Sequence, residues 1–297
     1  MAQPQEKTWA PAWKKASEPK SIADILQGLQ TLRFRKAEQG GSESQPQYEC
    51  PTCKDQGGYL DEGIEEQDGK FVRVRPDRYV ECECVKKKRV DRLFKTSQIT
   101  AEFQKMGFKN FVREGRPVAV QDAYECAVTY YRNFHTIRNT RRNSIALLGS
   151  PGAGKTHLLT AIANCLMQTE WTDENGKKKL GIPVLYLTWV DLLNELKDDF
   201  DLLLTKVQQM QQVEVLFIDD MFKGRKEPTP FQLEQLFSIV NYRYLNNKPM
   251  LISSERDIDQ MCEIDEAIGS RIYEMCQDYT VLLKGNSKEL NYRLREA

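Results

Sequence analysis

The sequence lacks long hydrophobic runs, a secretory leader and net charge. No stretch of 18 consecutive apolar residues occurs, so no membrane span is predicted. Residues 1–15 hold no apolar segment of the kind that a secretory signal requires. The 43 basic residues balance the 43 acidic ones, which argues against coating of nucleic acid by bulk charge but leaves local basic stretches open. We therefore expect a cytoplasmic protein.

No internal repeat is visible either, and the eight cysteines are not expected to form disulfides. In a reducing cytoplasm, cysteines are thiols or metal ligands. The length of 297 residues suits two domains better than one.

Changes in composition along the chain divide it into four segments. Residues 1–47 begin with a polar, proline-containing tail, and apolar side chains at helical spacing predict a short helix over 21–37. Residues 48–95 contain four of the cysteines. Residues 96–143 are expected to be a helical linker that leads into a larger domain core over 144–297.

From residue 144 onward, short apolar runs alternate with stretches of helical periodicity. The runs are SIALLG, PVLYLT, VEVLFIDD, KPMLISS and YTVLLKG. Strands that are buried on both faces give such continuous runs, and the alternation with helices is typical of parallel sheets. We therefore predict an α/β fold with a mostly parallel sheet.

A phosphate-binding loop follows the first of these runs. The sequence GSPGAGKTH matches G-x-x-x-x-G-K-[ST] at Gly149, Gly154, Lys155 and Thr156. The glycines let backbone amides turn toward phosphate oxygens, Lys155 reaches the terminal phosphates, and the Thr156 hydroxyl binds Mg²⁺. We expect the nucleotide to contact the whole loop: Gly149, Ser150, Pro151, Gly152, Ala153, Gly154, Lys155, Thr156 and His157.

A phosphate loop of this kind needs an acidic group to hold the metal ion. VLFIDD ends an apolar run with Asp219 and Asp220. Two aspartates at the end of a strand are often only a turn or a helix cap, but downstream of a phosphate loop they indicate a metal site. Asp219 is the candidate for contact with Mg²⁺, and Asp220 is the candidate for polarising an attacking water molecule.

With these motifs, the span 144–297 resembles the AAA+ ATPases of the DnaC/DnaI helicase-loader group, which includes the transposition ATPase IstB. The matching stretches are LLGSPGAGKTHLLTAIAN, VLYLTWVDLLNELK, VLFIDDMF, KPMLISSERD and AIGSRIYEMC. The resemblance implies a P-loop core with a five-stranded sheet and no full C-terminal lid. It also implies ATP at subunit boundaries, a hexameric replicative helicase and single-stranded DNA as partners, and self-association.

The resemblance assigns further roles to matching residues. The strand end Ser253-Ser254-Glu255 resembles sensor 1, which lies beside the γ-phosphate and often ends in Asn, so Glu255 departs from the pattern. Arg271 resembles the arginine finger, which places positive charge on the γ-phosphate of a neighbouring subunit. Arg293 resembles a closing Tyr-Arg pair, whose arginine contacts nucleotide or remains in solvent. The candidate catalytic residues are Lys155, Asp220, Glu255 and Arg271.

Four cysteines lie ahead of this core as two pairs, Cys50 with Cys53 and Cys82 with Cys84. Two pairs can close a tetrahedron around Zn²⁺, and the intervening glycines and strand-like stretches suit a zinc ribbon. The alternative is four unrelated thiols. CPTCKDQGGYL also resembles the N-terminal module of DnaI-type loaders, which implies zinc and a contact with the helicase. Glu83 is expected to face solvent.

Two other features remain open in the sequence. Basic stretches over 85–95 and 132–142 can bind DNA phosphates or an acidic protein surface, or can simply be solvated. The remaining cysteines fall in helical segments and are predicted to be buried thiols: Cys126, Cys165, Cys262 and Cys276.

These features favour an ATP-dependent helicase loader of DNA replication. A transposase-assisting ATPase on duplex DNA shares the fold, but that branch generally lacks a cysteine module. A third hypothesis is an adaptor that uses nucleotide as a switch without significant hydrolysis, because Asp220 and Glu255 both depart from the residues usual in AAA+ proteins.

Overall fold

The computed structural model describes residues 48–67, 69–173, 175–195, 200–224 and 228–294. The tail and the helix expected within residues 1–47 lie outside the described residues. Within the described part of the chain, each helix is too short or too polar to cross a bilayer.

The chain divides into two units after Asp55, and the described residues of the first unit, 48–55, form bends and turns. The second unit begins with two antiparallel strand pairs, in which β1 pairs with β4 and β2 with β3. The bounds are β1 Gly58–Asp61, β2 Ile64–Gln67, β3 Lys70–Arg73 and β4 Arg78–Glu81. These hairpins confirm the strands predicted between the two cysteine pairs.

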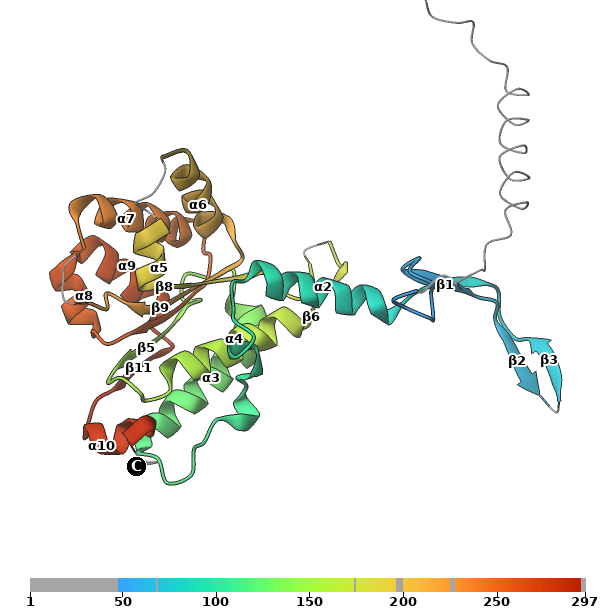
Figure 1. The fold of residues 1–297 in the computed structure, drawn as a ribbon, viewed down its shortest axis with the longest axis horizontal. Coiled ribbons are helices and arrows are strands. Elements are labelled where there is room, and N and C mark those ends of the chain that lie inside the picture. Colours follow the sequence, from blue (N-terminus) through green and yellow to red (C-terminus); the bar gives the residue numbers. More distant parts are fainter. Residues whose placement is uncertain (1–47, 68, 174, 196–199, 225–227, 295–297) are drawn as a thin grey trace, which may run out of the picture. The chain divides into compact units, whose positions relative to one another are not determined.

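A five-stranded parallel sheet forms the centre of the second unit (Figure 1), with the strand order β11-β5-β10-β9-β8. All five predicted runs are strands of this sheet, which confirms the α/β prediction. The bounds are β5 Ile145–Gly149, β8 Val184–Thr188, β9 Val215–Met221, β10 Met250–Ser254 and β11 Thr280–Leu283. A short hairpin of β6 Glu170–Thr172 and β7 Lys178–Leu180 precedes β8 and was not predicted.

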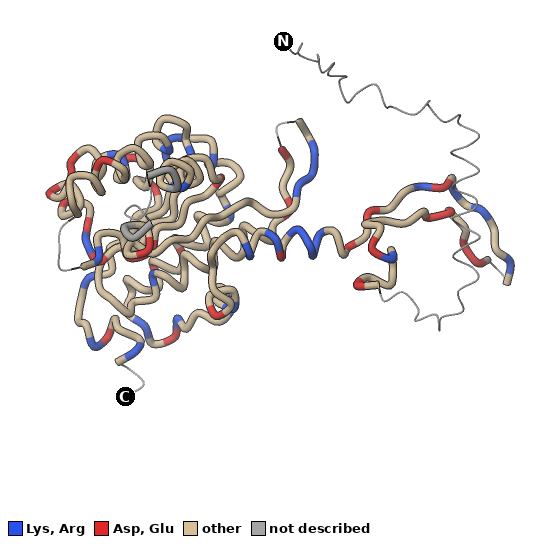
Figure 2. Tube along the Cα trace, turned by 45° about the horizontal axis from the view of Figure 1, so that its top comes forward, with Lys and Arg blue, Asp and Glu red and all other residues tan. Residues whose placement is uncertain are grey.

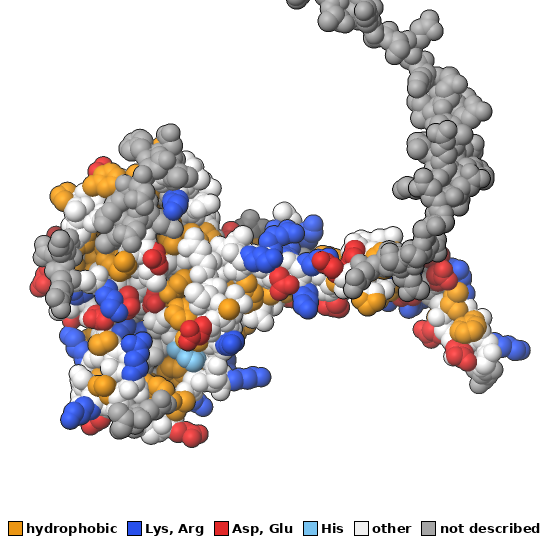
Figure 3. Space-filling model, viewed as in Figure 1, with side chains coloured by type: hydrophobic (Ala, Val, Ile, Leu, Met, Phe, Trp, Pro, Cys, Tyr) orange, Lys and Arg blue, Asp and Glu red, His pale blue; other side chains and the backbone are white. Residues whose placement is uncertain are grey.

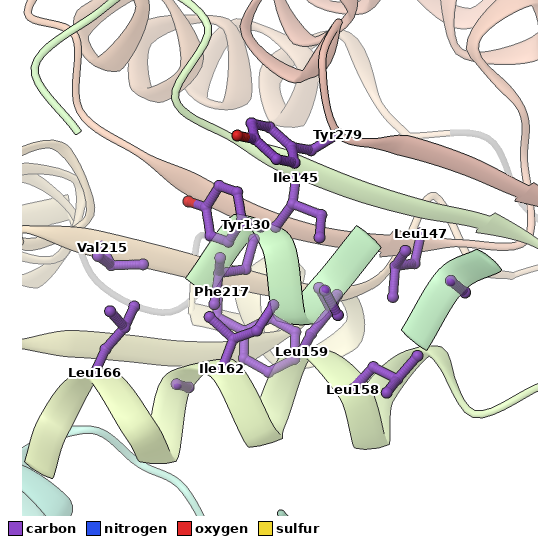
Figure 4. Packing of buried hydrophobic residues seen from close by; sticks show 14 of the residues in the cluster. Tyr130, Ile145, Leu147, Leu158, Leu159, Ile162, Leu166, Val215, Phe217 and Tyr279 are labelled. Atoms are coloured by element: carbon purple, nitrogen blue, oxygen red, sulfur yellow. The ribbon is translucent and has the colours of Figure 1, made fainter. Parts of the chain in front are cut away.

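Side chains alternate between the two faces of the sheet, as a period of two requires. In β5, Ile145 and Leu147 join one buried cluster, whereas Ala146 and Leu148 join the other. Figure 4 shows part of the first cluster, in which Phe217 of β9 and Leu159 lie between sheet and helices. Because both faces are buried, these strands appear in the sequence as continuous apolar runs.

Helices cover both faces. Residues of α3 and α4 pack in the first cluster, and residues of α5 to α9 pack in the second. The helix bounds are α2 Glu83–Thr96, α3 Val118–Ile137, α4 Lys155–Gln168, α5 Trp189–Glu195, α6 Phe200–Gln212, α7 Pro230–Leu245, α8 Ile258–Ile264, α9 Glu266–Cys276 and α10 Ser287–Leu290. The described residues also form 3₁₀ turns at η2 Phe103–Lys105, η3 Phe108–Asn110 and η4 Tyr292–Leu294.

Beyond α9, the described chain contains only β11, α10 and η4. The four helical cysteines are less buried than predicted. Cys276 is fully buried, but Cys126, Cys165 and Cys262 are partly exposed.

Candidate nucleotide site and cysteine cluster

The phosphate loop connects β5 to α4 at the carboxyl edge of the sheet, where ligands bind in open α/β folds. Its backbone takes left-handed angles at three glycines, with φ of +104° at Gly149, +69° at Gly152 and +99° at Gly154. Residues with a Cβ rarely adopt such angles. The glycine spacing in the motif therefore has a direct conformational cause.

The loop glycines also allow close approaches. A Cβ at Gly154 would lie 2.6 Å from Cε2 of Phe111, and one at Gly149 would lie 2.4 Å from the Leu283 carbonyl oxygen. Any side chain at these positions would therefore displace the loop from its neighbours. The loop thus lies between β11 and the segment that precedes α3.

Lys155, the first residue of α4, is buried beneath this loop. Its Nζ donates hydrogen bonds to the carbonyl oxygens of Gly149 and Ser150, each at 2.8 Å. Burial lowers the pKa of Lys155, while the carboxylates of Asp220, Glu255 and Asp219 act in the opposite direction. A phosphate would give this ammonium group a charged partner in place of neutral carbonyls.

Asp219 is held among hydroxyl groups near the end of β9. Its Oδ1 accepts hydrogen bonds from Thr156 Oγ1, at 2.8 Å, and from Ser253 Oγ. Its Oδ2 accepts a 3.3 Å hydrogen bond from the hydroxyl of Tyr186. Burial raises the pKa of Asp219. The adjacent Thr156 hydroxyl and Asp219 carboxylate are oxygen donors of the type that Mg²⁺ prefers.

Asp220, next to the last residue of β9, has a left-handed conformation with φ of +55°. The register between β9 and β10 shifts at this point, and such irregularities re-aim side chains near sites. The Asp220 amide donates to Ser253 Oγ at 2.7 Å. Its Oδ2 lies 2.7 Å from Nζ of Lys223, which in turn lies 3.5 Å from Oε1 of Glu255.

These groups line one cavity of about 550 Å³, a size typical of small-ligand sites. Its phosphate-loop residues are Pro151, Gly152, Gly154, Lys155, Thr156 and His157. Its remaining lining residues are Phe103, Met106, Asn110, Phe111, Val112, Arg116, Tyr186, Thr188, Asp219, Asp220, Lys223, Glu255, Tyr292 and Arg293. The cavity therefore combines aromatic and apolar surface with charged groups, as a nucleotide requires.

The segment 103–116 forms one wall of the cavity, which the sequence did not reveal. Phe111 stacks on Tyr124 of α3, with ring centroids 5.8 Å apart, and meets His157 edge-on at 5.2 Å. Arg116 is 5% exposed, and its Nη2 donates to the carbonyl oxygens of Leu290, at 2.8 Å, and Ala153, at 3.3 Å. The only signal in the sequence is the aromatic spacing of FQKMGFKNF.

Most of the predicted site residues converge here. Arg293 lines the cavity beside Tyr292, although its side chain is exposed. Among the lining residues of the described chain, Gly149, Ser150 and Ala153 do not appear. The carbonyl oxygens of Gly149 and Ser150 accept hydrogen bonds from Lys155, and that of Ala153 accepts one from Arg116. These three residues therefore help to fix the conformation of the loop.

Arg271 lies on α9 and is not among the residues that line this cavity in the described chain. Its Nε donates to Asn241 Oδ1 at 3.0 Å, and one Nη donates to the Ala267 carbonyl oxygen at 2.8 Å. Its guanidinium lies over the rings of Phe237 and Tyr244. These contacts hold the side chain against α7, which contributes Asn241, Phe237 and Tyr244.

The four N-terminal cysteines form a cluster. Their Sγ atoms all lie within 4.8 Å of one another, and Cys53 and Cys82 are buried. A tetrahedral zinc site with Zn–S distances near 2.3 Å needs sulfur–sulfur separations of about 3.8 Å. Four thiolate donors at this spacing fit Zn²⁺. Glu83 has an 82% exposed side chain that pairs with Lys86, so its predicted solvent exposure is confirmed.

The two basic stretches differ in the structure. The basic residues of 85–95 lie on α2, which has no buried residue, and Figure 3 shows blue side chains gathered over this helix. Figure 2 shows further basic positions on the hairpin whose strand β7 packs against α2. Over 132–142, by contrast, Arg138, Arg141 and Arg142 form ion pairs with the partly exposed carboxylates of Glu214, Glu274 and Asp278. Three basic side chains of that stretch are therefore already paired within the chain.

Comparison with known proteins places this site in a family. The family described as "Bacterial DnaA ATPase domain" matches residues 103–276, a span that includes the phosphate loop, the paired aspartates and the 103–116 wall. The chain is also similar to DnaA of Streptococcus thermophilus, with 31% identity over 134 residues. That alignment covers 43% of this chain and 27% of DnaA.

Two relatives from Bacillus subtilis (strain 168) match along nearly the whole length. YqaM is 43% identical, covering 95% of this chain and 97% of YqaM. The phage-like element PBSX protein XkdC is 46% identical, covering 93% of this chain and 97% of XkdC. Among solved structures, the DnaC helicase loader covers 62% of this chain and 100% of its own, with 21% identity and a TM-score of 0.48. The chain belongs to the family of the bacterial DnaA ATPase domain.

Proposed function

We propose that this protein is an ATP-dependent helicase loader that acts when DNA replication begins. It binds a hexameric replicative helicase and places it on single-stranded DNA, and copies of the chain bind and hydrolyse ATP at their shared boundaries. Because XkdC bears the name of a phage-like element, the proposed setting is replication of the DNA of a mobile element.

One observation supports the binding and hydrolysis of ATP. The hydroxyl of Thr156 donates a hydrogen bond to the carboxylate of Asp219, beside the buried Lys155. These groups would hold Mg²⁺ and the terminal phosphates, and Mg²⁺ would neutralise charge on the transferred phosphoryl group. Asp220 would orient the attacking water, and Arg271 of a neighbouring copy would add positive charge. Lys155 binds the same phosphates and keeps them in line.

The cysteine cluster supports the loader over the transposase-assisting alternative. Four thiolates around Zn²⁺ leave no coordination position for a substrate, so the metal would be structural. The hairpins between the cysteine pairs expose large apolar side chains, including Leu60, Phe71 and Tyr79. Such side chains on a small stabilised module suit contact with a partner protein.

The nucleotide-switch hypothesis also has a supporting observation. Asp220, the candidate for activating water, is paired with Lys223 at 2.7 Å. A carboxylate neutralised in this way is a poor base. Release of phosphate by the wild type, compared with the Asp219→Ala and Arg271→Ala variants, distinguishes the two functions. Turnover by the wild type that both variants lose supports the loader, whereas no turnover with helicase and DNA present supports the switch.

The loader function is tested by capture of the purified cognate helicase on the full-length protein, with and without ATP. We expect binding by the wild type and loss of binding by the Cys53→Ser/Cys82→Ser variant. The matched control is Cys165→Ser, which changes a cysteine of α4 outside the cluster. Failure of the wild type to bind the helicase in either nucleotide state would contradict the proposal.

A further inference from the structure

Lys223 occupies a position that none of the motifs assigns. It follows β9, and the turn that carries it has left-handed residues at Asp220 and at Phe222, with φ of +60° at the latter. The Lys223 amide donates to the Asp220 carbonyl oxygen at 3.0 Å, which closes the turn. This geometry returns the Lys223 side chain toward the carboxylates at the end of the sheet.

The ammonium group of Lys223 lies between two of these carboxylates. Its Nζ is 2.7 Å from Oδ2 of Asp220 and 3.5 Å from Oε1 of Glu255. All three residues line the nucleotide cavity together with Lys155. Lys155 and Lys223 therefore both present their ammonium groups to one side of the cavity, where Asp220 and Glu255 lie.

That region is where the terminal phosphate of a bound nucleotide belongs, because the phosphate-loop lysine reaches the β- and γ-phosphates. A γ-phosphate brought there would lie among the carboxylates of Asp219, Asp220 and Glu255. Mg²⁺ would offset the charge of Asp219, but Glu255 cannot donate a hydrogen bond when ionised. A second cation beside Glu255 would resolve this repulsion.

Lys223 can provide that cation. Its side chain is 48% exposed, and a lysine ammonium is a compact charge on a flexible stem with three donors. It can therefore turn from Asp220 to a phosphate oxygen while it stays close to Glu255. The same movement would release Asp220 to accept a hydrogen bond from water.

We propose that Lys223 is a specificity-determining residue that binds the γ-phosphate of ATP held by its own chain. Glu255 positions the ammonium group, so an acidic residue and a lysine together replace the neutral polar side chain that is common at sensor 1. The site thereby distinguishes ATP from ADP. This inference rests on the proposed function, because it requires a triphosphate in the cavity.

The test compares the affinities of the full-length protein for the non-hydrolysable analogue AMPPCP and for ADP, both with Mg²⁺. Hydrogen bonds to charged groups are strong enough that Lys223→Met is expected to weaken AMPPCP binding about 10- to 100-fold. Binding of ADP, which has no γ-phosphate, is expected to change by less than about 2-fold. Lys223→Arg should restore much of the preference for the triphosphate, whereas a purely structural role would not be rescued selectively.

Lys284→Met is the matched control. Lys284 also pairs with an aspartate at 2.7 Å, Asp257, but it is not among the cavity-lining residues of the described chain. The control should keep the wild-type preference. Glu255→Gln supplies a second variant, which should keep more of the preference for AMPPCP than Lys223→Met does, because the lysine remains and the substitution also removes a charge that repels the γ-phosphate.

The possible outcomes separate the inference from the proposed function. If Lys223→Met weakens AMPPCP and ADP binding equally, or changes neither, the role of Lys223 is overturned. The proposal that the protein binds ATP is not affected by either result. Unchanged affinities with faster hydrolysis would show that Lys223 only restrains Asp220, and would also overturn that role. A wild type that binds neither nucleotide contradicts the proposed function itself.

Discussion

At the scale of single residues, Asp219 lowers the folding stability of the protein when Mg²⁺ and nucleotide are not bound. Asp219 is 5% exposed, and its carboxylate accepts hydrogen bonds from the hydroxyl groups of Thr156, Ser253 and Tyr186. Three neutral donors offset only part of the cost of burying a charge. Mg²⁺ would provide the missing positive charge, so the unfavourable residue in the empty state is the useful one in the filled state.

We therefore predict that Asp219→Asn stabilises the nucleotide-free protein and abolishes Mg²⁺-dependent hydrolysis. Burial raises the pKa of Asp219 above its unfolded value of 3.8, so the folded state binds the proton more tightly than the unfolded state. Stability is then lost as the pH rises from 3.8 through the raised pKa. Asparagine avoids this loss and can still accept hydrogen bonds from Thr156 and Ser253.

The measurement is thermal unfolding in the presence of a chelator. At neutral pH we expect the variant to melt roughly 2–4 °C above the wild type, which corresponds to about 1 kcal/mol in a domain of this size. The difference should shrink as the pH is lowered toward the range in which the Asp219 carboxyl is protonated. Asp220→Asn is the control, because Asp220 is less buried and pairs with Lys223. A variant that melts below the wild type at neutral pH would refute the prediction.

At the scale of elements, the site depends on a loop and a wall that come from separate parts of the chain. The phosphate loop follows β5, and the wall is the segment 103–116 that precedes α3. They meet where Phe111 covers Gly154. The alignment of this loop therefore depends on packing against Phe111 as well as on its own glycines.

Substitution of Gly154 by alanine is predicted to disturb both the fold and nucleotide binding. A left-handed alanine costs about 1–2 kcal/mol, and the new Cβ, 2.6 Å from Phe111 Cε2, adds about 1–3 kcal/mol of overpacking. Chemical denaturation measures the total, and nucleotide titration measures the functional effect.

Gly176→Ala separates the two contributions. Gly176 has a comparable φ of +74°, but a Cβ added there would meet no heavy atom within 4 Å, so only the backbone cost applies. We expect the control to lose less stability and to keep wild-type nucleotide affinity. Equal destabilisation by the two substitutions would show that the contact with Phe111 contributes nothing.

An element can be predicted from the sequence when its environment imposes a regular pattern of residues on it. Strands such as β5 and β9 are buried on both faces, so their apolar runs identify them. The loop was identified because its glycines and Lys155 have fixed spacing. Phe103 and Phe111, however, lie in and next to 3₁₀ turns without a regular period. The role of Lys223 depends on the turn at Asp220 and Phe222, which local sequence does not encode.

At the scale of the whole molecule, two sites of different chemistry occupy one chain. None of the four clustered cysteines is among the described residues that line the nucleotide cavity. The candidate zinc ligands and the lining of the candidate nucleotide cavity are therefore separate sets of side chains. Structural zinc sites contribute directly to folding, because the ligands are brought together only in the folded, metal-bound state.

We predict one zinc ion per chain, and that its removal disrupts the β1–β4 hairpins but spares nucleotide binding. Metal content is measured by elemental analysis before and after a strong chelator, and affinity for AMPPCP is expected to change by less than about 2-fold. Cys53→Ser should lack zinc, whereas Cys165→Ser, outside the cluster, should retain it. Loss of zinc and of nucleotide affinity together would contradict the separation of the two sites.

The phosphate loop is also bonded to a segment far away in the chain. The Tyr292 amide donates to the Gly152 carbonyl oxygen at 3.0 Å, and Arg116 joins the Ala153 and Leu290 carbonyl groups. A rearrangement of the loop on nucleotide binding is therefore expected to alter the hydrogen bond to Tyr292 of η4. Deuterium uptake at the Tyr292 amide would then report occupancy of the site, at a position about 140 residues away from the loop in the sequence.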